Sequence, residues 1–345
     1  MQGRSAHGPA GRVPRRALCA LGLAAALTAA APAVHAQEFV MKFATQTAND
    51  VQTEFMRAYK EQLEQDTHNR IRVDLYASAQ LGAAPRQAEG LRLGTIEAGV
   101  GPGELFAGID QRFQVLALSG LFRDVEHARR ALVVPELHDA VRDLAASRNL
   151  VLIGINLFDL QEFSFTTPVT SLKGFPGKRL RVLASEGEQR AVSALGGSPV
   201  PMALPEVLAA LQQRTIDGQT TGMPVYSAFR YYDTSPYLLD THLWAIVSLS
   251  VVSKAFYNRL PSDLQKAVVE AGAKVEPEVT KWSLARNEAD RKNWIEHGGK
   301  IATLSPEEQE DAVRRSTESV EALLNKNAAL KEFYEKIRAA ARTAL

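Results

Sequence analysis

The sequence has little of what metal, redox, nucleic-acid and membrane proteins need. One cysteine among 345 residues excludes an internal disulfide and any cysteine-rich zinc or iron–sulfur site. The charges nearly cancel, with 40 basic and 39 acidic side chains, whereas a nucleic-acid-binding protein usually carries a basic excess or stripe. The mean hydropathy of -0.15 excludes a protein with many membrane-spanning segments. The length is that of a globular protein of roughly two domains.

The first 36 residues differ in composition from the rest of the chain. They contain no acidic residue, and an apolar run of about 15 residues follows their last arginine, too short for the ~20 residues of a membrane-spanning helix. Small residues at Val34 and Ala36 complete the pattern of a secretory signal peptide cleaved before Gln37. The arginines of this segment are Arg4, Arg12, Arg15 and Arg16.

Removal of residues 1–36 changes the charge and the cysteine count of the protein. The remaining 309 residues hold 36 basic and 39 acidic side chains, a net charge of −3, and Cys19 leaves with the signal peptide. An exported, mildly acidic chain without thiols is typical of the bacterial periplasm. We therefore expect a periplasmic protein.

Strand-like and helix-like patterns alternate along the remaining chain. This alternation predicts an α/β fold with largely parallel sheets, in which ligands bind beyond the carboxyl ends of the strands. Expected strands are 39–44, 70–76, 98–101, 150–155, 178–183 and 215–217, and expected helices include 51–65, 85–93 and 206–213. Capping boxes are expected at Ser185, Ser262 and Ser305. Helical periodicity continues from 262 to 297, and Pro277 should kink or split that stretch.

The sequence lacks the usual catalytic and cofactor motifs. Its five histidines after residue 36 are not paired as metal ligands, and no nucleophile elbow or phosphate-binding loop is present. The spacing of Gly99, Gly101 and Gly103 does not fit a dinucleotide-binding turn. We predict no metal, no cofactor and no catalysis. The histidines are His68, His127, His138, His242 and His297.

One group of residues fits the recognition of an anion. Arg179 and Arg181 lie on the same side of the expected strand 178–183, and the helix that Ser185 opens follows at once. The free amides and dipole of a helix N-terminus favour an anion, and a guanidinium offers a carboxylate two parallel donors. The alternative is that both arginines are ordinary surface charges.

Ordered segments of the chain resemble the substrate-binding proteins of TRAP transporters, of the DctP type. The resemblance covers nearly all of the chain after residue 36, and the ordered combination is more specific than any one segment. The segments are QLG at 80–82, LGTIEAG at 93–99, KRLRV at 178–182, GGSPVPM at 196–202, EVLAALQ at 206–212, IDGQ at 216–219, YYD at 231–233 and LPSDLQ at 260–265.

The resemblance implies a two-domain α/β fold like that of type II periplasmic binding proteins, with a cleft between the domains and a long helix that spans them. Domain I would comprise 37–158 and about 247–287, and domain II 159–246 and about 288–345. The cleft would close over a small organic acid, whose carboxylate binds Arg181. The partners would be the two permease subunits in the membrane, a small one of four helices and a large one of twelve.

Three positions depart from the family pattern and suggest a small ligand. Gln161 stands where a second arginine is common, Thr221 follows the turn where an asparagine is frequent, and Leu204 replaces an aromatic residue. One arginine with amides and hydroxyls suits a monocarboxylate, a hydroxy or keto acid, or a dicarboxylate. Further candidates for ligand contact are Phe158, Gln219, Ser185 and Gly101, whereas Met202, Tyr231, Tyr232 and Trp244 are expected in the core.

Other functions stay open on the sequence alone. The chain could serve a different transport or sensing system as a periplasmic binding protein, or it could be an exported lyase or isomerase of organic acids. A scaffold protein without a ligand is the third alternative.

Overall fold

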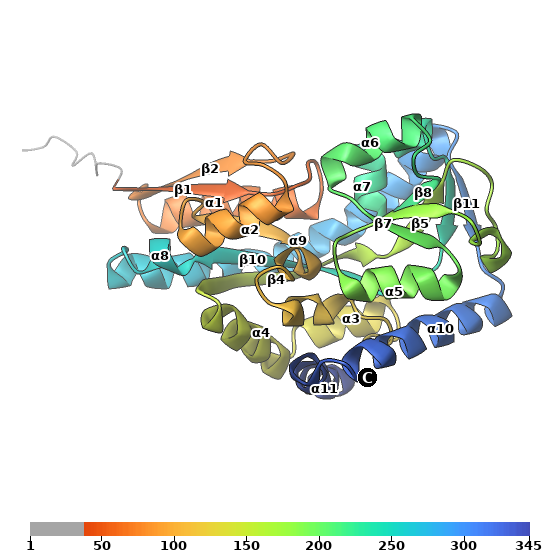
Figure 1. The fold of residues 1–345 in the computed structure, drawn as a ribbon. Helices are drawn as coiled ribbons and strands as arrows, with labels where there is room; N and C mark the ends of the chain where they lie inside the picture. The colour runs from red at the N-terminus through yellow and green to blue at the C-terminus, as the bar shows by residue number, and fades with distance from the viewer. Residues whose placement is uncertain (1–37) are drawn as a thin grey trace, which may run out of the picture. The chain divides into compact units, whose positions relative to one another are not determined.

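The computed structural model describes residues 38–345, which cluster as one compact unit. The predicted signal peptide and its cleavage site at Gln37 lie outside the described residues. Within residues 38–345 two sheets are flanked by helices, as Figure 1 shows. In the same range no helix is both long enough and apolar enough to cross a lipid bilayer.

The first sheet has five strands, and its core is aromatic. Its order is β2 (Ile71–Tyr76), β1 (Phe39–Ala44), β3 (Ala98–Pro102), β10 (Ala245–Ser253) and β4 (Leu150–Leu160). Helix α1 (Val51–Asp66) covers it because Phe55 and Tyr59 pack on Phe43, with ring centroids 6.3 and 5.6 Å away. The other helices are α2 (Ala84–Leu93), α3 (Val125–Leu132), α4 (Pro135–Ser147) and the short α8 (Lys254–Tyr257).

The second sheet has six strands. Its order is β11 (Lys300–Thr303), β9 (Tyr237–Asp240), β5 (Glu162–Phe165), β8 (Gly218–Thr221), β6 (Arg179–Val182) and β7 (Ser198–Pro201). Strands β6, β7 and β8 are parallel, so their carboxyl ends lie at one edge. Helices α5 (Glu186–Leu195), α6 (Leu204–Gln212) and α7 (Met223–Ala228) follow these strands.

Two crossing strands join the sheets. Strand β4 ends at Leu160 and β5 begins at Glu162, so Gln161 alone separates the part in the first sheet from the part in the second. The segment that returns from β9 to β10 runs beside Gln161, whose backbone amide donates to the Trp244 carbonyl at 2.9 Å. Strand β10 is antiparallel to both neighbours and β5 to both of its own, so the sheets are mixed rather than largely parallel.

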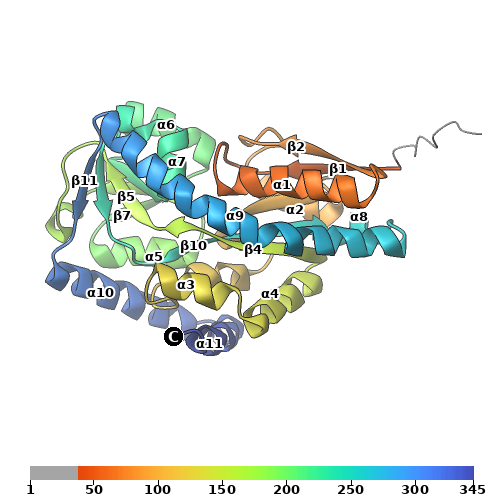
Figure 2. The ribbon, with the colours of Figure 1, turned by 180° about the vertical axis from the view of Figure 1, so that it is seen from behind.

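A single helix, α9 (Ser262–Glu296), runs for 35 residues along both sheets. Its first part contacts α1 and β4, and its last part contacts α7 and β11. Pro277 lies inside it without splitting it, and Figure 2 shows the helix changing direction near its middle. Trp294 is fully buried against Tyr226 and Tyr232, which fixes the distal part of the helix to the second sheet.

Several local expectations are corrected by tertiary contacts. Ser185 and Ser305 cap their helices, but the glutamate of each expected box turns away: Glu188 accepts from the Leu183 amide and Glu308 from the Leu172 amide. Ser262 is not a cap, since Pro261 holds that position. The strand expected at 215–217 begins three residues later, at Gly218, because Asp217 closes a turn on Arg179.

The C-terminal helices contact both halves of the fold. Helix α10 (Pro306–Leu324) packs on α5, next to the second sheet. Helix α11 (Ala328–Arg342) returns to α3 and α4 beside the first sheet.

Gly272 sets the distance between α9 and β4. A Cβ atom at this position would overlap the backbone carbonyl of Ile153, which cannot move without breaking the sheet. We expect Gly272→Ala to lower the free energy of unfolding by about 3 kcal/mol, at the upper end of overpacking costs. Thermal denaturation tests this against Gly108→Ala, whose added Cβ meets no atom within 4 Å. Equal melting temperatures for both variants would contradict the tight contact.

Candidate functional site

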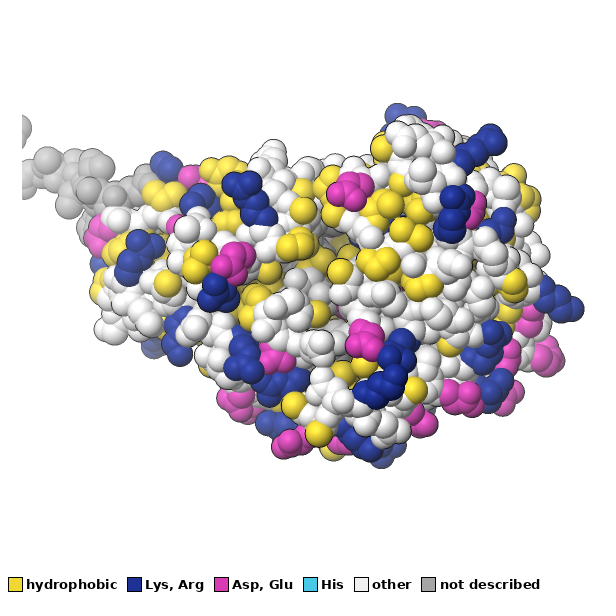
Figure 3. Space-filling view, in the orientation of Figure 1, with side chains coloured by type: hydrophobic (Ala, Val, Ile, Leu, Met, Phe, Trp, Pro, Cys, Tyr) yellow, Lys and Arg dark blue, Asp and Glu magenta, His cyan; other side chains and the backbone are white. Residues whose placement is uncertain are grey.

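A cavity of about 480 Å³ lies between the two sheets. Five strands, β1, β3, β6, β7 and β8, direct their carboxyl ends toward it, as expected for a ligand site in an α/β fold. Figure 3 shows hydrophobic side chains gathered around a hollow on this face. The volume lies within the range of small-molecule sites, roughly 300–1,000 Å³.

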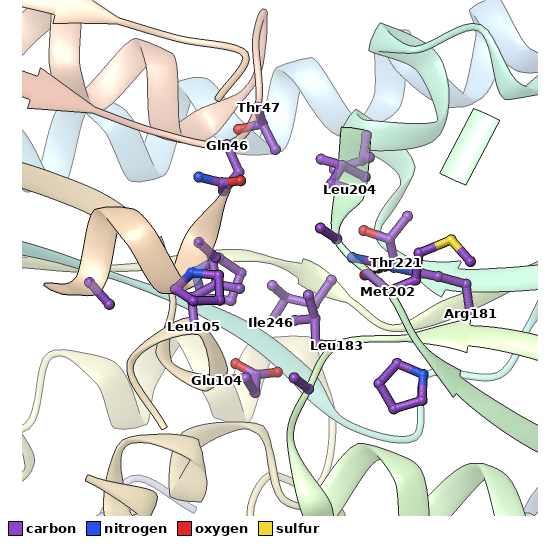
Figure 4. Close-up of a pocket in the computed structure, with 18 of the residues that line it drawn as sticks. Gln46, Thr47, Glu104, Leu105, Arg181, Leu183, Met202, Leu204, Thr221 and Ile246 are labelled. Carbon is purple, nitrogen blue, oxygen red and sulfur yellow. Dashed lines mark hydrogen bonds between the residues drawn. The ribbon is translucent and has the colours of Figure 1, made fainter. Parts of the chain in front are cut away.

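Arg181 reaches into this cavity from β6. Its neighbours Leu180 and Val182 point into the hydrophobic core on the other side of the sheet, so the strand alternation sends Arg181 toward the cavity. Figure 4 shows the side chain beside Met202 and Thr221. Arg181 is 2% exposed, and its guanidinium donates from Nε to the Met202 carbonyl at 3.0 Å and from Nη1 to the Thr220 carbonyl at 3.5 Å.

The positive charge of Arg181 has no counter-ion at contact distance. Among residues 38–345 no carboxylate oxygen lies within 4.0 Å of its guanidinium nitrogens. Burial lowers the pKa of Arg181 from its usual value, and the nearby charge of Glu188 opposes that shift. A buried guanidinium without a counter-ion is costly unless an anion reaches it.

Arg179 does not join Arg181 in a two-arginine fork. Its side chain is exposed at the other end of β6 and binds Asp217, with Nε 2.9 Å from Oδ2. It also donates to the Arg214 carbonyl at 2.7 Å. The expectation of a shared anion site is therefore wrong for Arg179, which holds the turn before β8.

Gln161 and Glu188 form a buried pair next to Arg181. The Gln161 side-chain amide donates from Nε2 to Glu188 Oε1 at 2.8 Å, and the Leu183 backbone amide donates to Oε2 at 2.6 Å. Burial raises the pKa of Glu188 to about 7, although Arg181 and these hydrogen bonds favour its ionised form. Gln161 thus connects the crossing strand to the cavity.

The N-terminus of α5 is not the open anion site that the sequence predicted. Ser185 caps the helix by accepting from the Glu188 amide at 3.2 Å, and the Gly187 amide donates to Gln114 Oε1 at 3.1 Å. Ser185 is buried and does not line the cavity. Its place in the structure is that of a helix cap.

The remaining candidates divide between the cavity wall and the interior. Phe158, Thr221 and Leu204 line the cavity together with Arg181 and Gln161. Gln219 and Gly101 do not: Gln219 points into the interior of the second sheet, and Gly101 contacts Leu105 beside a smaller hollow. Met202, expected in the core, lines the cavity, whereas Tyr231, Tyr232 and Trp244 are buried as expected.

Sequence reasoning missed the wall that the first sheet contributes. Gln46, Thr47 and Gln52 lie where β1 passes into α1, and Glu104 lies just after β3. The polar run at 45–47 directly after a buried strand is a usable signal, because ligands bind beyond strand ends. Glu104 has no such signal, since a single acid after a glycine-rich turn is common at surfaces.

A cluster of charged side chains holds the crossing strands to α9. His242 Nε2 lies 2.6 Å from Asp240 Oδ1, and Arg291 of α9 contacts Glu162 and, at 3.3 Å, Asp240. The oxygen and nitrogen atoms of Glu162, Asp240 and His242 are close enough for a metal ion. The Arg291 guanidinium already supplies positive charge there, so the group forms an ion-pair network.

A cavity between two α/β sheets that crossing strands and a long helix connect defines a two-domain solute-binding protein. The profile of DctP, the bacterial extracellular solute-binding proteins of family 7, matches residues 43–327. The chain belongs to this family. The predicted fold class, α/β with a type II-like periplasmic-binding-protein architecture, is confirmed.

Individual relatives and structures agree with this assignment. The chain is 27% identical over 232 residues to the 2,3-diketo-L-gulonate-binding periplasmic protein YiaO of Escherichia coli, covering 67% of this chain and 71% of YiaO. A TRAP periplasmic solute-binding protein of Haemophilus influenzae, solved with L-gulonate, has a TM-score of 0.82 at 23% identity and covers 88% and 99% of the two chains. The galactonate complex of a sugar-acid-binding protein from Advenella mimigardefordensis gives 0.83 at 22%, covering 89% and 98%.

Protonation of His242 should stabilise its ion-pair network with Asp240, Glu162 and Arg291. Burial lowers the pKa of His242, but hydrogen bonds to Asp240 and Glu162 outweigh this and raise it to about 9. An unfolded histidine titrates near pH 6.5, so the stabilisation is complete below about 6.5 and disappears as the pH rises toward 9. We expect wild type to melt above His242→Gln in acidic buffer and the difference to shrink by about pH 9. A difference that is constant over this range would disprove the ion-pair role.

Proposed function

We propose that the protein is the periplasmic receptor of a TRAP transporter. It binds a small organic acid anion in the cavity and delivers it to the membrane permease, which consists of a four-helix and a twelve-helix subunit. The observation that carries the proposal is Arg181, a buried arginine that lines the cavity and has no counter-ion at contact distance among residues 38–345. The predicted signal peptide at 1–36 would supply the route to the periplasm.

The ligand carboxylate completes the charge balance that the protein leaves open. The guanidinium can offer it parallel N–H donors, and the carbonyls of Met202 and Thr220 keep the side chain in place. Exclusion of water from the closed cavity strengthens the ion pair. One such pair with a few hydrogen bonds and apolar contacts is sufficient for micromolar affinity, about −8 kcal/mol.

The other cavity residues favour a monocarboxylate with further polar groups, such as a hydroxy or keto acid. Gln161, Thr221 and Thr47 offer amide and hydroxyl groups, while Phe158 and Leu204 offer apolar surface. The acids named for the relatives, L-gulonate and galactonate, belong to this chemical class. Arg181 is the one arginine that residues 38–345 contribute to the cavity wall, which argues against a second full negative charge on the ligand.

Closure of the cavity is the proposed signal to the permease. The two walls belong to different sheets, and those sheets are connected through the crossing strands at Gln161 and through α9. Hinge closure around a ligand is a known two-state transition of such architectures. The receptor releases its ligand chemically unchanged, which agrees with a family of solute-binding proteins.

Loss of Arg181 should abolish ligand binding. In a thermal-shift screen of organic acids, we expect the acid that stabilises wild type to have no effect on Arg181→Ala. Because that variant leaves Glu188 buried without its neighbouring charge, Arg181→Met combined with Glu188→Gln provides a neutral second form. Its affinity should fall by at least about thirtyfold, as truncating a buried charge pair costs roughly 2–5 kcal/mol.

Arg179→Ala is the matched control, because Arg179 lies on the same strand and its ion pair is exposed. It should bind the acid as wild type does. Undiminished stabilisation of both Arg181 variants would refute the proposed site, and mass spectrometry of the recovered acid would reveal any turnover.

A further inference from the structure

Glu104 faces the cavity from the wall opposite Arg181. It lies in the 3-10 turn Gly103–Phe106 after β3, is 5% exposed and lines the cavity. Its Oε2 atom has no hydrogen-bond partner among residues 38–345. Figure 4 shows the carboxyl group directed into the cavity from the first-sheet side, while Arg181 approaches from the second.

Among residues 38–345 no positively charged side chain forms an ion pair with Glu104. Strands β3 and β10, which pack beside the turn, carry no titratable side chain, and Glu89 of α2 is paired with Arg92. Arg112, in the next turn, is bound to Asp110. Across the cavity, Arg181 and Glu206 line the wall, and Glu188 is buried outside that lining.

These surroundings favour the neutral carboxyl form of Glu104. Burial raises its pKa to about 8, and the charge of Glu188 acts in the same direction. Two ionised carboxylates near one guanidinium would also repel the organic anion that the cavity is proposed to bind. A protonated Glu104 removes this repulsion and gives the cavity one hydrogen-bond donor and one acceptor.

We propose that Glu104 is a specificity-determining residue that, as a neutral carboxyl group, holds a hydroxyl or carbonyl group of the ligand at the end remote from Arg181. The inference rests on the proposed function and narrows its substrate class. The ligand is then an organic acid whose second polar group lies several bonds from its carboxylate. An unsubstituted fatty acid of the same length leaves Glu104 unsatisfied and binds less tightly.

The test compares hydroxylated acids with unsubstituted acids of equal chain length. Calorimetry measures the affinity of the wild type for L-gulonate against hexanoate and for 4-hydroxybutyrate against butyrate. The better hydroxylated acid should bind at least about tenfold more tightly than its partner, because a buried carboxyl group left without a hydrogen-bond partner is costly. Its affinity should fall as the pH rises past about 8, because Glu104 then loses its proton.

Two substitutions separate the carboxyl chemistry from packing. Glu104→Gln keeps a donor and an acceptor, so it should retain affinity within about threefold and lose the pH dependence near 8. Glu104→Leu should lose the preference for the hydroxylated acid while still binding the unsubstituted one. Glu186→Gln changes an exposed acid outside the cavity wall and serves as the control.

Each alternative outcome is decisive. An unchanged preference in Glu104→Leu overturns the inference. The inference is also overturned if the affinity of the wild type rises with pH and this rise is lost in Glu104→Gln, because the ligand would then present a cation to an ionised Glu104. In both cases acids still bind through Arg181 and the receptor function stands. If no organic acid binds wild type, the proposed function itself fails and the role of Glu104 with it.

Discussion

The desolvated charge of Arg181 is the constraint around which the cavity is arranged. Arg181 is 2% exposed and has no ion pair within residues 38–345, so its guanidinium must be held by oriented dipoles, which the carbonyls of Met202 and Thr220 provide. Met202 directly follows β7, and Thr220 lies in β8. These two strands are the parallel neighbours of β6, which carries Arg181. The parallel arrangement of three short strands therefore determines where a carboxylate can bind.

The carboxyl groups near this charge are kept from neutralising it. Glu188 is turned away into hydrogen bonds with Gln161 and the Leu183 amide, and Glu104 lies on the opposite wall. Because Gln161 is also the one residue between β4 and β5, the polar contact that restrains Glu188 belongs to the connection between the sheets. Gln161 therefore takes part both in the electrostatics of the site and in the connection between the two sheets.

Local sequence patterns predicted many of the regular elements. Strand β1, helix α2 with its left-handed Gly94, and the place of Arg181 on β6 follow from periodicity and from helix-ending residues. The choice of Arg181 over Arg179 as the ligand contact came from the resemblance to the DctP family and not from periodicity. The patterns could not predict which of two possible partners a polar side chain binds. Glu188 and Glu308 accept hydrogen bonds from backbone amides outside their helix caps, and Arg179 pairs with Asp217. These contacts exist only in the folded chain. Glu104 is missed for the same reason, since its burial depends on the wall opposite it.

Gly272 gives the long helix an unequal mechanical role along its length. Backbone contact at Ile153 leaves no clearance for the first half of α9 to slide over β4, while Trp294 anchors the far end among the tyrosines of the second sheet. Any displacement of one sheet relative to the other must then be absorbed as flexure between these anchors. Pro277 lies in that interval, and because it has no amide hydrogen the helix lacks one backbone hydrogen bond there. The stiffness of this span, and not the cavity alone, would set how far the walls can separate to exchange a solute.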